Sequence, residues 1–335
     1  MKERRPGMKV KGLYHMFEGG GYYRIRMPLA ELANHGHRTS CEPAKTSAEA
    51  DGADIVVAHM AGTVMWREAP QVHRWWRRLA TTCRRVYELD DDPFELEHTN
   101  PAFTQYNAGN SRDSLMHCIQ TADLVTASVP PLAERIAKLN PRVAVCKNRI
   151  DESLLTVARA RRTKLVIGWA GGPSHFEDMK EADYGLRRTV DRHPNICEIH
   201  YIGADMRRVV RRAARFTPWA PKTADYYRLI DFDIGIAPLR PGVFTDAKSY
   251  IKALEYAALG IPVVASDVTP YRDFVIDGVT GWLVRGPQMW AARLRDLVND
   301  TAMRTEMGAK AKTLAAGHTI QTGWTDWETA YRSVL

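Results

Sequence analysis

Two lysines and one glutamate stand where their side chains could bind a phosphorylated ligand. Lys248, Lys252 and Glu255 are spaced i, i+4 and i+7, so in a helix they would share one face. Lysines near a helix N-terminus attract a diphosphate, and a carboxylate a turn or two later can accept hydrogen bonds from both hydroxyls of a ribose. The spacing indicates a receptor for a nucleoside diphosphate. The alternative is a solvent-exposed ion pair on a helix, worth about a few tenths of a kcal/mol.

The elements expected around these side chains are read from residues 249–284. Apolar residues at helical spacing predict a buried stripe of Tyr250, Leu254, Ala257 and Ala258. Gly260 has the place of a glycine that ends a helix. The following residues 262–265, Pro-Val-Val-Ala, are typical of a strand covered on both faces. A second helix, loop and strand should complete the segment.

Length and composition limit the class of protein. A chain of 335 residues with 45% hydrophobic and 26% charged residues is expected to fold as two domains of an ordinary globular protein. No apolar run reaches the roughly 20 residues of a membrane-spanning helix. We expect residues 1–7 to be a loose tail and not a signal peptide, because lysines interrupt the apolar residues that follow. The cysteines are odd in number and never form C-x-x-C, which favours reduced thiols in a cytoplasm over disulfides or a zinc site: Cys41, Cys83, Cys118, Cys146 and Cys197.

The formal net charge of +8 favours acidic partners, namely nucleotide sugars, anionic lipid surfaces or nucleic acid. Arginines gather in two sets, at positions 74, 77, 78, 84 and 85 and at positions 207, 208, 211, 212 and 215. Trp75 and Trp76 within the first set favour a surface-binding patch, whereas the helical spacing of the second is typical of a solvated face. Charge by itself does not separate DNA from a membrane surface.

Strands alternate with helices along the whole chain, which predicts an α/β protein with two doubly wound, Rossmann-like units. The first unit is expected to begin with a strand over residues 9–16 and a helix over residues 27–34, and the second with a strand over residues 164–169. Each first strand is followed by glycines. Ligands of such sheets bind at the carboxyl ends of the strands, so we expect a cleft between the two domains. The further strands are expected at residues 54–59, 85–89, 124–128, 143–146, 198–202 and 233–237.

The glycines after the first strand form a candidate ligand loop. Gly19, Gly20 and Gly21 lack side chains, so backbone amides can approach a ligand closely. Arg24 and Arg26 follow at positions where they could meet negative charge. Arg24 stands where the dinucleotide fingerprint has its last glycine, which weakens a dehydrogenase interpretation. The alternative is a merely flexible loop.

Acidic residues and a histidine also stand at expected strand ends. Of Asp90, Asp91 and Asp92, the first and third could hold a metal as a D-x-D pair. One aspartate could instead act as a base on the acceptor side or bind sugar hydroxyls, or the three could cap a helix or turn. His59 ends the strand DIVVAH and could face a cleft or be a buried structural histidine.

Three stretches of the second half resemble glycosyltransferase family 4, a family of retaining enzymes with the GT-B fold. They are DIGIAPL at 233–239, KSYIKALEYAALGIPVVAS at 248–266 and DGVTGWLV at 277–284. The resemblance runs from about residue 164 to 331 and is weaker over residues 10–151. It implies an acceptor-side domain over residues 1–155, a nucleotide-sugar domain over 156–315, and a C-terminal helix over 316–335 that crosses back to the first domain.

The resemblance also implies roles for single residues. It assigns Gly20, Gly21, Gly171, Gly172, Lys248 and Lys252 to the diphosphate and Glu255 to the ribose. The stretch before the helix expected at 225–230 resembles the loop that holds the nucleobase, which makes Trp219 a neighbour of the base, unless it is a core residue. His59 and Asp91 are expected on the acceptor side, and no metal or tightly bound cofactor is expected.

One position departs from the family pattern. The family has two glutamates in E-x7-E, and the first would fall on Ala247. Asp246 or Lys248 could take its contact with the donor sugar, so the departure concerns the sugar more than the nucleotide.

The function expected is transfer of a sugar from a UDP- or GDP-sugar type of donor to an acceptor hydroxyl, with retention of configuration. The acceptor is open among a small molecule, a lipid-linked sugar, a protein side chain and a hydroxylated base in DNA, which would need arginine contacts to phosphates. The alternatives are a nucleotide-sugar epimerase and a non-catalytic binding protein on the same scaffold.

Overall fold

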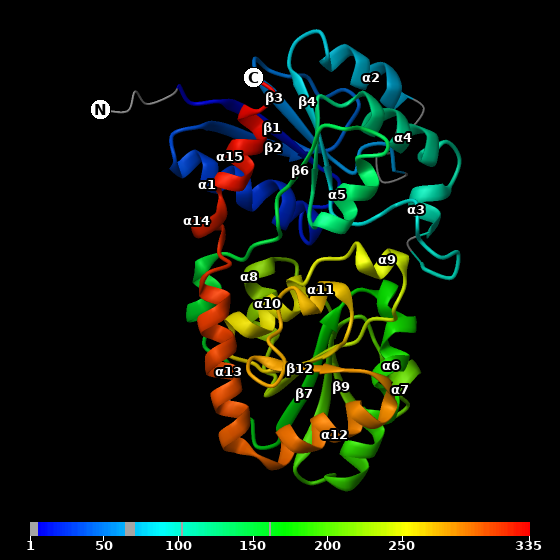
Figure 1. The fold of residues 1–335 in the computed structure, drawn as a ribbon, viewed down its shortest axis with the longest axis vertical. Coiled ribbons are helices and arrows are strands. Elements are labelled where there is room, and N and C mark those ends of the chain that lie inside the picture. Colours follow the sequence, from blue (N-terminus) through cyan, green and yellow to red (C-terminus); the bar gives the residue numbers. More distant parts are fainter. Residues whose placement is uncertain (1–5, 64–70, 102, 161) are drawn as a thin grey trace. The chain divides into compact units, whose positions relative to one another are not determined.

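The computed structural model describes the chain except for residues 1–5, 64–70, 102 and 161. It divides into two compact units (Figure 1). Unit 1 contains residues 1–149, 247–249 and 320–335, and unit 2 contains residues 150–246 and 250–319. The chain therefore changes unit at 149/150 and 319/320, where boundaries were expected after residues 155 and 315. The brief return of residues 247–249 to unit 1 was not predicted.

Unit 1 is built on a six-stranded sheet in the order β2-β1-β3-β4-β5-β6, in which every pair is parallel. The strands are β1 (Lys9–Tyr14), β2 (Arg38–Pro43), β3 (Ile55–His59), β4 (Arg84–Leu89), β5 (Leu124–Ala127) and β6 (Val143–Val145). β1 to β5 except β2 are almost wholly buried. Because a covered parallel strand needs apolar residues on both faces, their continuous hydrophobic runs made them predictable. β2, which is largely exposed at the sheet edge, was not predicted.

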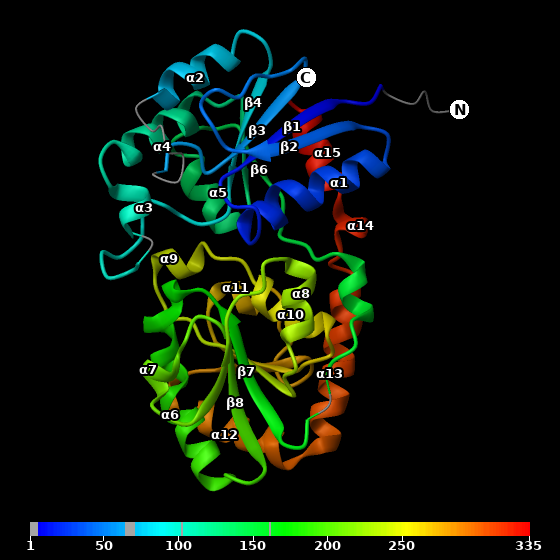
Figure 2. The ribbon, with the colours of Figure 1, turned by 180° about the vertical axis from the view of Figure 1, so that it is seen from behind.

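The helices of unit 1 pack on both faces of this sheet (Figures 1 and 2). They are the π-helix η1 (Tyr22–Arg26), α1 (Met27–Asn34), α2 (Val72–Leu79), α3 (Phe103–Asn107), α4 (Ser111–Thr121), α5 (Pro130–Ile136), α14 (Ile320–Gly323) and α15 (Thr325–Arg332). The helix expected at 27–34 is confirmed at those bounds.

Trp75 and Trp76 correct the expectation of a surface-binding patch. They are 1% and 0% exposed and lie in the main core of unit 1, together with side chains of α4 and α5. Their indole N–H groups donate to Ala48 O and Thr121 Oγ1. A buried indole needs such a partner, so this pair stabilises the core and does not bind a surface.

Unit 2 has a second six-stranded sheet, in the order β12-β11-β10-β7-β8-β9, again with every pair parallel. The strands are β7 (Leu165–Gly171), β8 (Cys197–Gly203), β9 (Ala214–Thr217), β10 (Ile234–Ala237), β11 (Val263–Ser266) and β12 (Gly281–Val284). β9 was not predicted, because it has only four residues, which are all partly buried and form no continuous apolar run.

Helices cover both faces of this sheet as well. They are η3 (Glu152–Thr156), η4 (Pro173–His175), α6 (Phe176–Arg192), α7 (Arg207–Val210), α8 (Thr223–Leu229), α9 (Val243–Asp246), α10 (Ile251–Ala258), α11 (Thr269–Arg272), α12 (Gly286–Asn299) and α13 (Thr301–Ala316). Successive residues of β7 belong to different cores. Val166 and Ala170 lie in the core with α8, α10 and α13, while Ile167 and Trp169 lie in the core with α6 and α12. This alternation follows from the two-residue period of a strand.

Two parallel, doubly wound sheets covered by helices confirm the class of fold expected from the sequence, α/β with two Rossmann-like domains. Among the described residues no helix combines the length and the apolarity needed to cross a bilayer.

Candidate functional site

The first candidate site lies in unit 2, where β7 and α10 meet. β7 ends at Gly171, and Lys252 in the first turn of α10 donates from its Nζ to the Ala170 carbonyl beside it. A Cβ on Gly171 would lie 2.9 Å from that Nζ and 2.4 Å from the Trp169 ring, so only glycine fits here. A Cβ on Gly172 would meet no atom within 4 Å. The glycine pair thus brings backbone amides and an ammonium group together.

Glu255 lies one helical turn after Lys252 and is 6% exposed. Its Oε2 accepts a hydrogen bond of 3.1 Å from the hydroxyl of Tyr226 on α8. Trp219, which precedes α8, has its ring centroid 4.9 Å from that of Tyr226 and is 47% exposed. Trp219 is therefore not a core residue. It packs on Tyr226, and about half of its surface is open to solvent.

The expected helix in this segment begins later than predicted. α10 starts at Ile251 with Tyr250 as its N-cap, so Lys248 lies before the helix and cannot share a face with Lys252 and Glu255. Lys248 belongs to unit 1, where its Nζ lies 3.3 Å from Oδ1 of Asp91. Ala247, at the position of the missing glutamate, is fully buried in the core of unit 1. The expected stripe of Tyr250, Leu254, Ala257 and Ala258 is buried, and Gly260 has the left-handed φ of 68° that a helix-ending glycine adopts.

Asp246 is held within unit 2. Its Oδ1 accepts a hydrogen bond of 2.7 Å from the hydroxyl of Thr269 on α11. Asp246 and Lys248 were both considered as replacements for the missing glutamate. Asp246 is bound by Thr269 within unit 2, and Lys248 is bound by Asp91 within unit 1.

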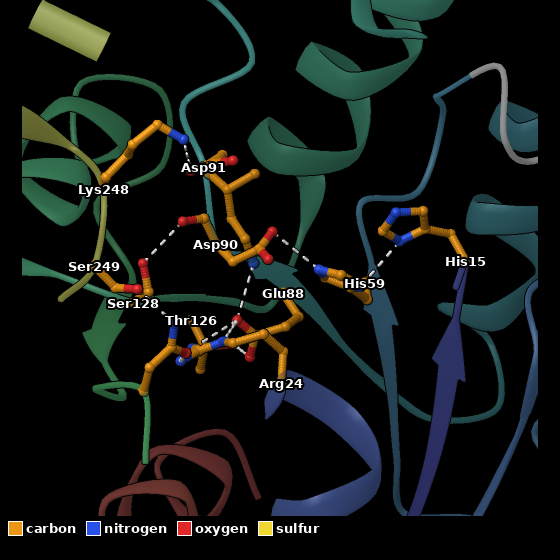
Figure 3. A network of polar contacts seen from close by, with 12 residues as sticks. His15, Arg24, His59, Glu88, Asp90, Asp91, Thr126, Ser128, Lys248 and Ser249 are labelled. Atoms are coloured by element: carbon orange, nitrogen blue, oxygen red, sulfur yellow. Dashed lines mark hydrogen bonds and ion pairs between the residues drawn. The ribbon is translucent and has the colours of Figure 1, made fainter. Parts of the chain in front are cut away.

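The second candidate site lies in unit 1, at the carboxyl ends of β1, β3 and β4 (Figure 3). His59 ends β3 and is fully buried. Its Nε2 lies 3.1 Å from Oδ1 of Asp90, which follows β4, and its Nδ1 lies 3.0 Å from Nδ1 of His15, which follows β1. His15 was not singled out from the sequence. Its place directly after the first strand, like that of His59, is the signal that could have found it.

The three aspartates after β4 have three different partners. Asp90 contacts His59, Asp91 contacts Lys248, and Asp92 accepts from Arg135 at 2.9 Å and from the backbone N–H of Phe94. Burial raises the pKa of Asp91, although Lys248 acts in the opposite direction. Within the described residues no three histidine, cysteine or carboxylate side chains are arranged as metal ligands.

The glycine loop of unit 1 packs on these side chains. A Cβ on Gly20 would lie 2.5 Å from Oδ2 of Asp90 and 2.8 Å from Cε1 of His59, and a Cβ on Gly21 would overlap the Met16 carbonyl. The loop therefore needs its glycines to fit against the protein itself. This gives a structural reason for Gly20 and Gly21 beside the expected contact with a diphosphate.

Arg24 corrects the expectation that it would face a ligand. Its side chain is 0% exposed, and Nε and Nη2 donate to Oε1 of Glu88 at 2.9 and 2.7 Å. Nη1 donates to the Cys146 carbonyl and to Asn148. The guanidinium is committed to these partners, so we assign Arg24 to the interior of unit 1.

The second arginine set is largely neutralised. Arg207 pairs with Asp205, Arg212 with Asp191, and Arg215 with Asp231. The helix α7 covers only Arg207–Val210 and Arg215 lies in β9, so the set does not form the single helical face that its spacing suggested.

Comparisons with known proteins show what the unit 2 part of the chain is similar to. Residues 165–300 match the model of the family Glycosyl transferases group 1. This part of the chain is related to the group 1 glycosyltransferases. The match contains the glycine pair, Trp219, Lys252 and Glu255, and it confirms the resemblance inferred from the sequence.

Two curated relatives share a name. The D-inositol 3-phosphate glycosyltransferase of Kineococcus radiotolerans is 32% identical over 186 residues, which cover 52% of this chain and 37% of the relative. The protein of the same name from Paenarthrobacter aurescens is 37% identical over 107 residues, 31% of this chain and 24% of the relative. The chain thus spans well under half the length of these relatives.

Solved structures match this chain over nearly its whole length. Anabaena Alr3699/HepE, determined with UDP and glucose, has a TM-score of 0.68 at 15% identity and covers 98% of this chain and 100% of its own. Sucrose-phosphate synthase from Thermosynechococcus elongatus has a TM-score of 0.66 at 12% identity, covering 98% and 99%. At these identities the likeness establishes the fold.

Proposed function

We propose that the chain transfers a sugar from a nucleoside diphosphate donor, of the UDP- or GDP-sugar type, to an acceptor hydroxyl with retention of anomeric configuration. The observation that carries the proposal is the group of Gly171, Lys252 and Glu255 inside the region that matches the group 1 family. An ammonium group beside open backbone amides suits a diphosphate, and a buried carboxylate one turn later suits a pair of ribose hydroxyls.

The chemistry follows from these groups. As the bond between the sugar and the diphosphate breaks, negative charge grows on the leaving oxygen. Lys252 and the amides after β7 would stabilise that charge more than they stabilise the bound donor, which lowers the barrier. Trp219, half exposed above Tyr226, offers an apolar surface for the base. His59 and Asp91 remain our candidates for the acceptor side, and Lys248, which was expected at the diphosphate, pairs with Asp91 in unit 1. Retention rests on the family resemblance alone and is measured from the anomeric configuration of the product by NMR.

The donor is identified first by thermal shift with UDP- and GDP-sugars. A ligand at 100 times its Kd raises the free energy of unfolding by about 2.7 kcal/mol, which gives a clear shift. Transfer is then measured as release of the nucleoside diphosphate, with D-inositol 3-phosphate as the first acceptor because the curated relatives are named for it.

Glu255→Gln tests the assignment directly. The substitution keeps the shape but removes the charge that strengthens hydrogen bonds to the ribose, each worth about 1.5–3 kcal/mol. We expect the Kd of the nucleoside diphosphate, measured by calorimetry, to rise roughly 10- to 100-fold, with the fold intact. Glu306→Gln is the matched control, because Glu306 is an exposed glutamate on α13 that pairs with Lys310. Equal affinity in Glu255→Gln and wild type would reject the ribose role.

A further inference from the structure

Two grooves run beside the helix α6 of unit 2. One lies between α6 and α7 and has a volume of about 460 Å³, and the other lies between α6 and α12 and has a volume of about 310 Å³. All three helices belong to unit 2 (Figures 1 and 2). We call the two grooves together the α6 face. Neither groove is lined by the glycine pair, Lys252 or Glu255 of the candidate donor site.

Basic side chains line the groove between α6 and α7. Five are basic and one, Asp183, is acidic. The basic residues are Lys180, Arg187, Arg208, Arg211 and Arg212. A groove with this balance attracts anions and focuses their field between its walls.

The groove between α6 and α12 has the same sign of charge. Arg188, Arg192 and Arg295 line it together with His193, and no carboxylate does. Arg187 and Arg188 are consecutive in α6, so they point about 100° apart and reach different grooves. The helix α6 thus supplies arginines to both grooves of the α6 face.

Ion pairs neutralise only part of this charge. Four basic residues have a carboxylate partner, in the pairs Lys180–Glu177, Arg187–Asp183, Arg212–Asp191 and Arg295–Asp296. Four exposed arginines form no ion pair within the described part of the chain, namely Arg188, Arg192, Arg208 and Arg211. Their positive charges are available to a ligand.

The type of cation indicates the type of anion. The first groove has four arginines and the second has three, against a single lysine in both. The planar guanidinium donates two parallel hydrogen bonds to a phosphate, which the point charge of a lysine cannot do. Two grooves with four available guanidinium groups suit a ligand that carries several phosphates in a row.

A membrane surface fits these observations less well than a nucleic acid. A helix that binds a bilayer inserts an apolar face below its charges. The apolar residues of α6, Met179, Ala182 and Leu186, are instead buried in the core of unit 2. A concave, basic groove follows the backbone of a nucleic acid strand, and an exposed aromatic ring lets a base stack. Tyr184 in the second groove is 39% exposed and offers such a ring.

We propose that the α6 face binds the phosphodiester backbone of a nucleic acid. The inference goes beyond the proposed function and does not depend on it, because binding is measured without a sugar donor. Phosphate contacts of this kind carry no sequence information. The α6 face therefore recognises a class of polymer, with its affinity set by charge.

The first experiment measures binding and its dependence on salt with the full chain. Fluorescence anisotropy is recorded with a labelled DNA duplex of about 30 base pairs and with a single strand of the same length. If four arginines each neutralise one phosphate, log K should fall against log salt with a slope of about −3 to −4 for the duplex. Affinity should then drop roughly 100-fold between about 50 and 200 mM salt.

Paired substitutions locate the binding surface. The double variants Arg188→Gln with Arg192→Gln, and Arg208→Gln with Arg211→Gln, each remove two available charges from one groove. Each should make the salt slope shallower by about 2 and weaken binding about 10-fold or more at about 50 mM salt. Their stability toward urea should stay close to that of the wild type, because exposed charges contribute little to it.

The matched control removes two exposed arginines from unit 1. Arg38 lies in β2 and Arg84 in β4, and neither forms an ion pair within the described residues. The double variant Arg38→Gln with Arg84→Gln loses the same charge but leaves the α6 face intact. It should keep the wild-type slope, since only contacted phosphates set that slope.

Three results would overturn the proposal. One is a wild-type protein that binds neither DNA probe at about 50 mM salt. Another is binding that the two groove variants weaken no more than the control does. The third is binding to vesicles of phosphatidylglycerol and phosphatidylcholine without binding to DNA, which would assign the α6 face to a lipid surface.

Discussion

Arg24 and Glu88 form an ion pair from which solvent is wholly excluded, since both side chains are 0% exposed. Every donor group of the guanidinium has a partner, and Oε2 of Glu88 accepts from Thr126 at 2.6 Å. Arg24 also lies 5.4 Å from the ring centroid of Trp327 in α15. Burial raises the pKa of Glu88 even though Arg24 favours its ionised form. Either side chain, left in this buried place without the other, would therefore lower the stability of the fold.

Removing one member should be far more damaging than removing both. Arg24→Met leaves a buried carboxylate without its cation and is expected to lower the free energy of unfolding by about 3–5 kcal/mol. The double variant Arg24→Met, Glu88→Gln should lose clearly less than the sum of the two single losses, as measured by urea unfolding in a double-mutant cycle. Additive losses would show that the two residues do not act as a pair.

At the scale of residues, the sequence identified part of the candidate site. Lys252, Glu255 and the glycines after β7 were predicted from their spacing and from the family resemblance, and the structure brings them close together. Arg24 could not be predicted as buried, because its partner Glu88 is 64 positions away. Lys248 was misplaced because helical spacing alone does not show where the first turn begins.

At the scale of elements, one glycine sets the distance between two helices. A Cβ on Gly185 in α6 would lie 2.7 Å from the Trp290 Cβ and 2.9 Å from the Trp290 backbone carbon in α12. Backbone atoms cannot rotate away as a side chain can, so the helices would have to move apart. Trp290 is 1% exposed and belongs to the core on this face of the unit 2 sheet.

Gly185→Ala should therefore destabilise unit 2 although alanine favours helix. The gain in helix propensity is about 1 kcal/mol, whereas overpacking typically costs about 1–3 kcal/mol, and here the clash involves backbone. We expect a net loss of about 1–2 kcal/mol in urea unfolding. Gly317→Ala at the end of α13, where the new Cβ would be 3.6 Å from its nearest neighbour, should be neutral or stabilising. A Gly185→Ala variant as stable as wild type would mean that the helices adjust freely.

The elements that the sequence revealed are those with strong periodicity or clear end signals. Buried parallel strands such as β3 and β11 were found from their apolar runs, and α1 from Pro28 in its first turn and Gly36 after it. The two strands that were not predicted, β2 and β9, lie at sheet edges and are at most partly buried. Neither strand has the continuous apolar run by which the buried strands were found, because polar residues are tolerated at a sheet edge.

At the scale of the whole molecule, the sequence predicted two sheets but not how the chain is shared between them. Residues 247–249 return to unit 1 in the middle of the second half, and Ser249 accepts a hydrogen bond of 2.8 Å from Asn148. Arg149 donates to Asp326 at 2.8 Å. Residues 148–149, where the chain leaves unit 1, are thus hydrogen-bonded to both segments that return to unit 1. These contacts join residues 101 and 177 positions apart and have no local signature, which is why the family resemblance and not periodicity suggested the return of the C-terminal helix.

The stability of this basic protein toward acid should depend on carboxylates that are ionised in the fold. Asp231 is 3% exposed, lies 2.7 Å from His200 Nδ1, and accepts from Arg215 at 2.6 Å and Arg162 at 2.7 Å. Burial would raise its pKa, but the hydrogen bonds from His200 and Arg215 lower it to about 2, below the ordinary 3.8. A depressed pKa adds stability above the unfolded value, and that stability is lost as the pH falls through the folded value.

We therefore expect the free energy of unfolding to decrease by about 1–2 kcal/mol through Asp231 between about pH 4 and pH 2, a figure reduced because the two arginines are partly exposed and screened. Urea unfolding at closely spaced pH values measures the slope. Asp231→Asn should be less stable than wild type at neutral pH but should lose less on acidification, because the titrating group is gone. Asp225→Asn, an exposed aspartate paired with Arg228, should keep the wild-type slope. Parallel pH curves for wild type and Asp231→Asn would contradict the assignment, and the acid sensitivity would then have to come from carboxylates elsewhere in the fold.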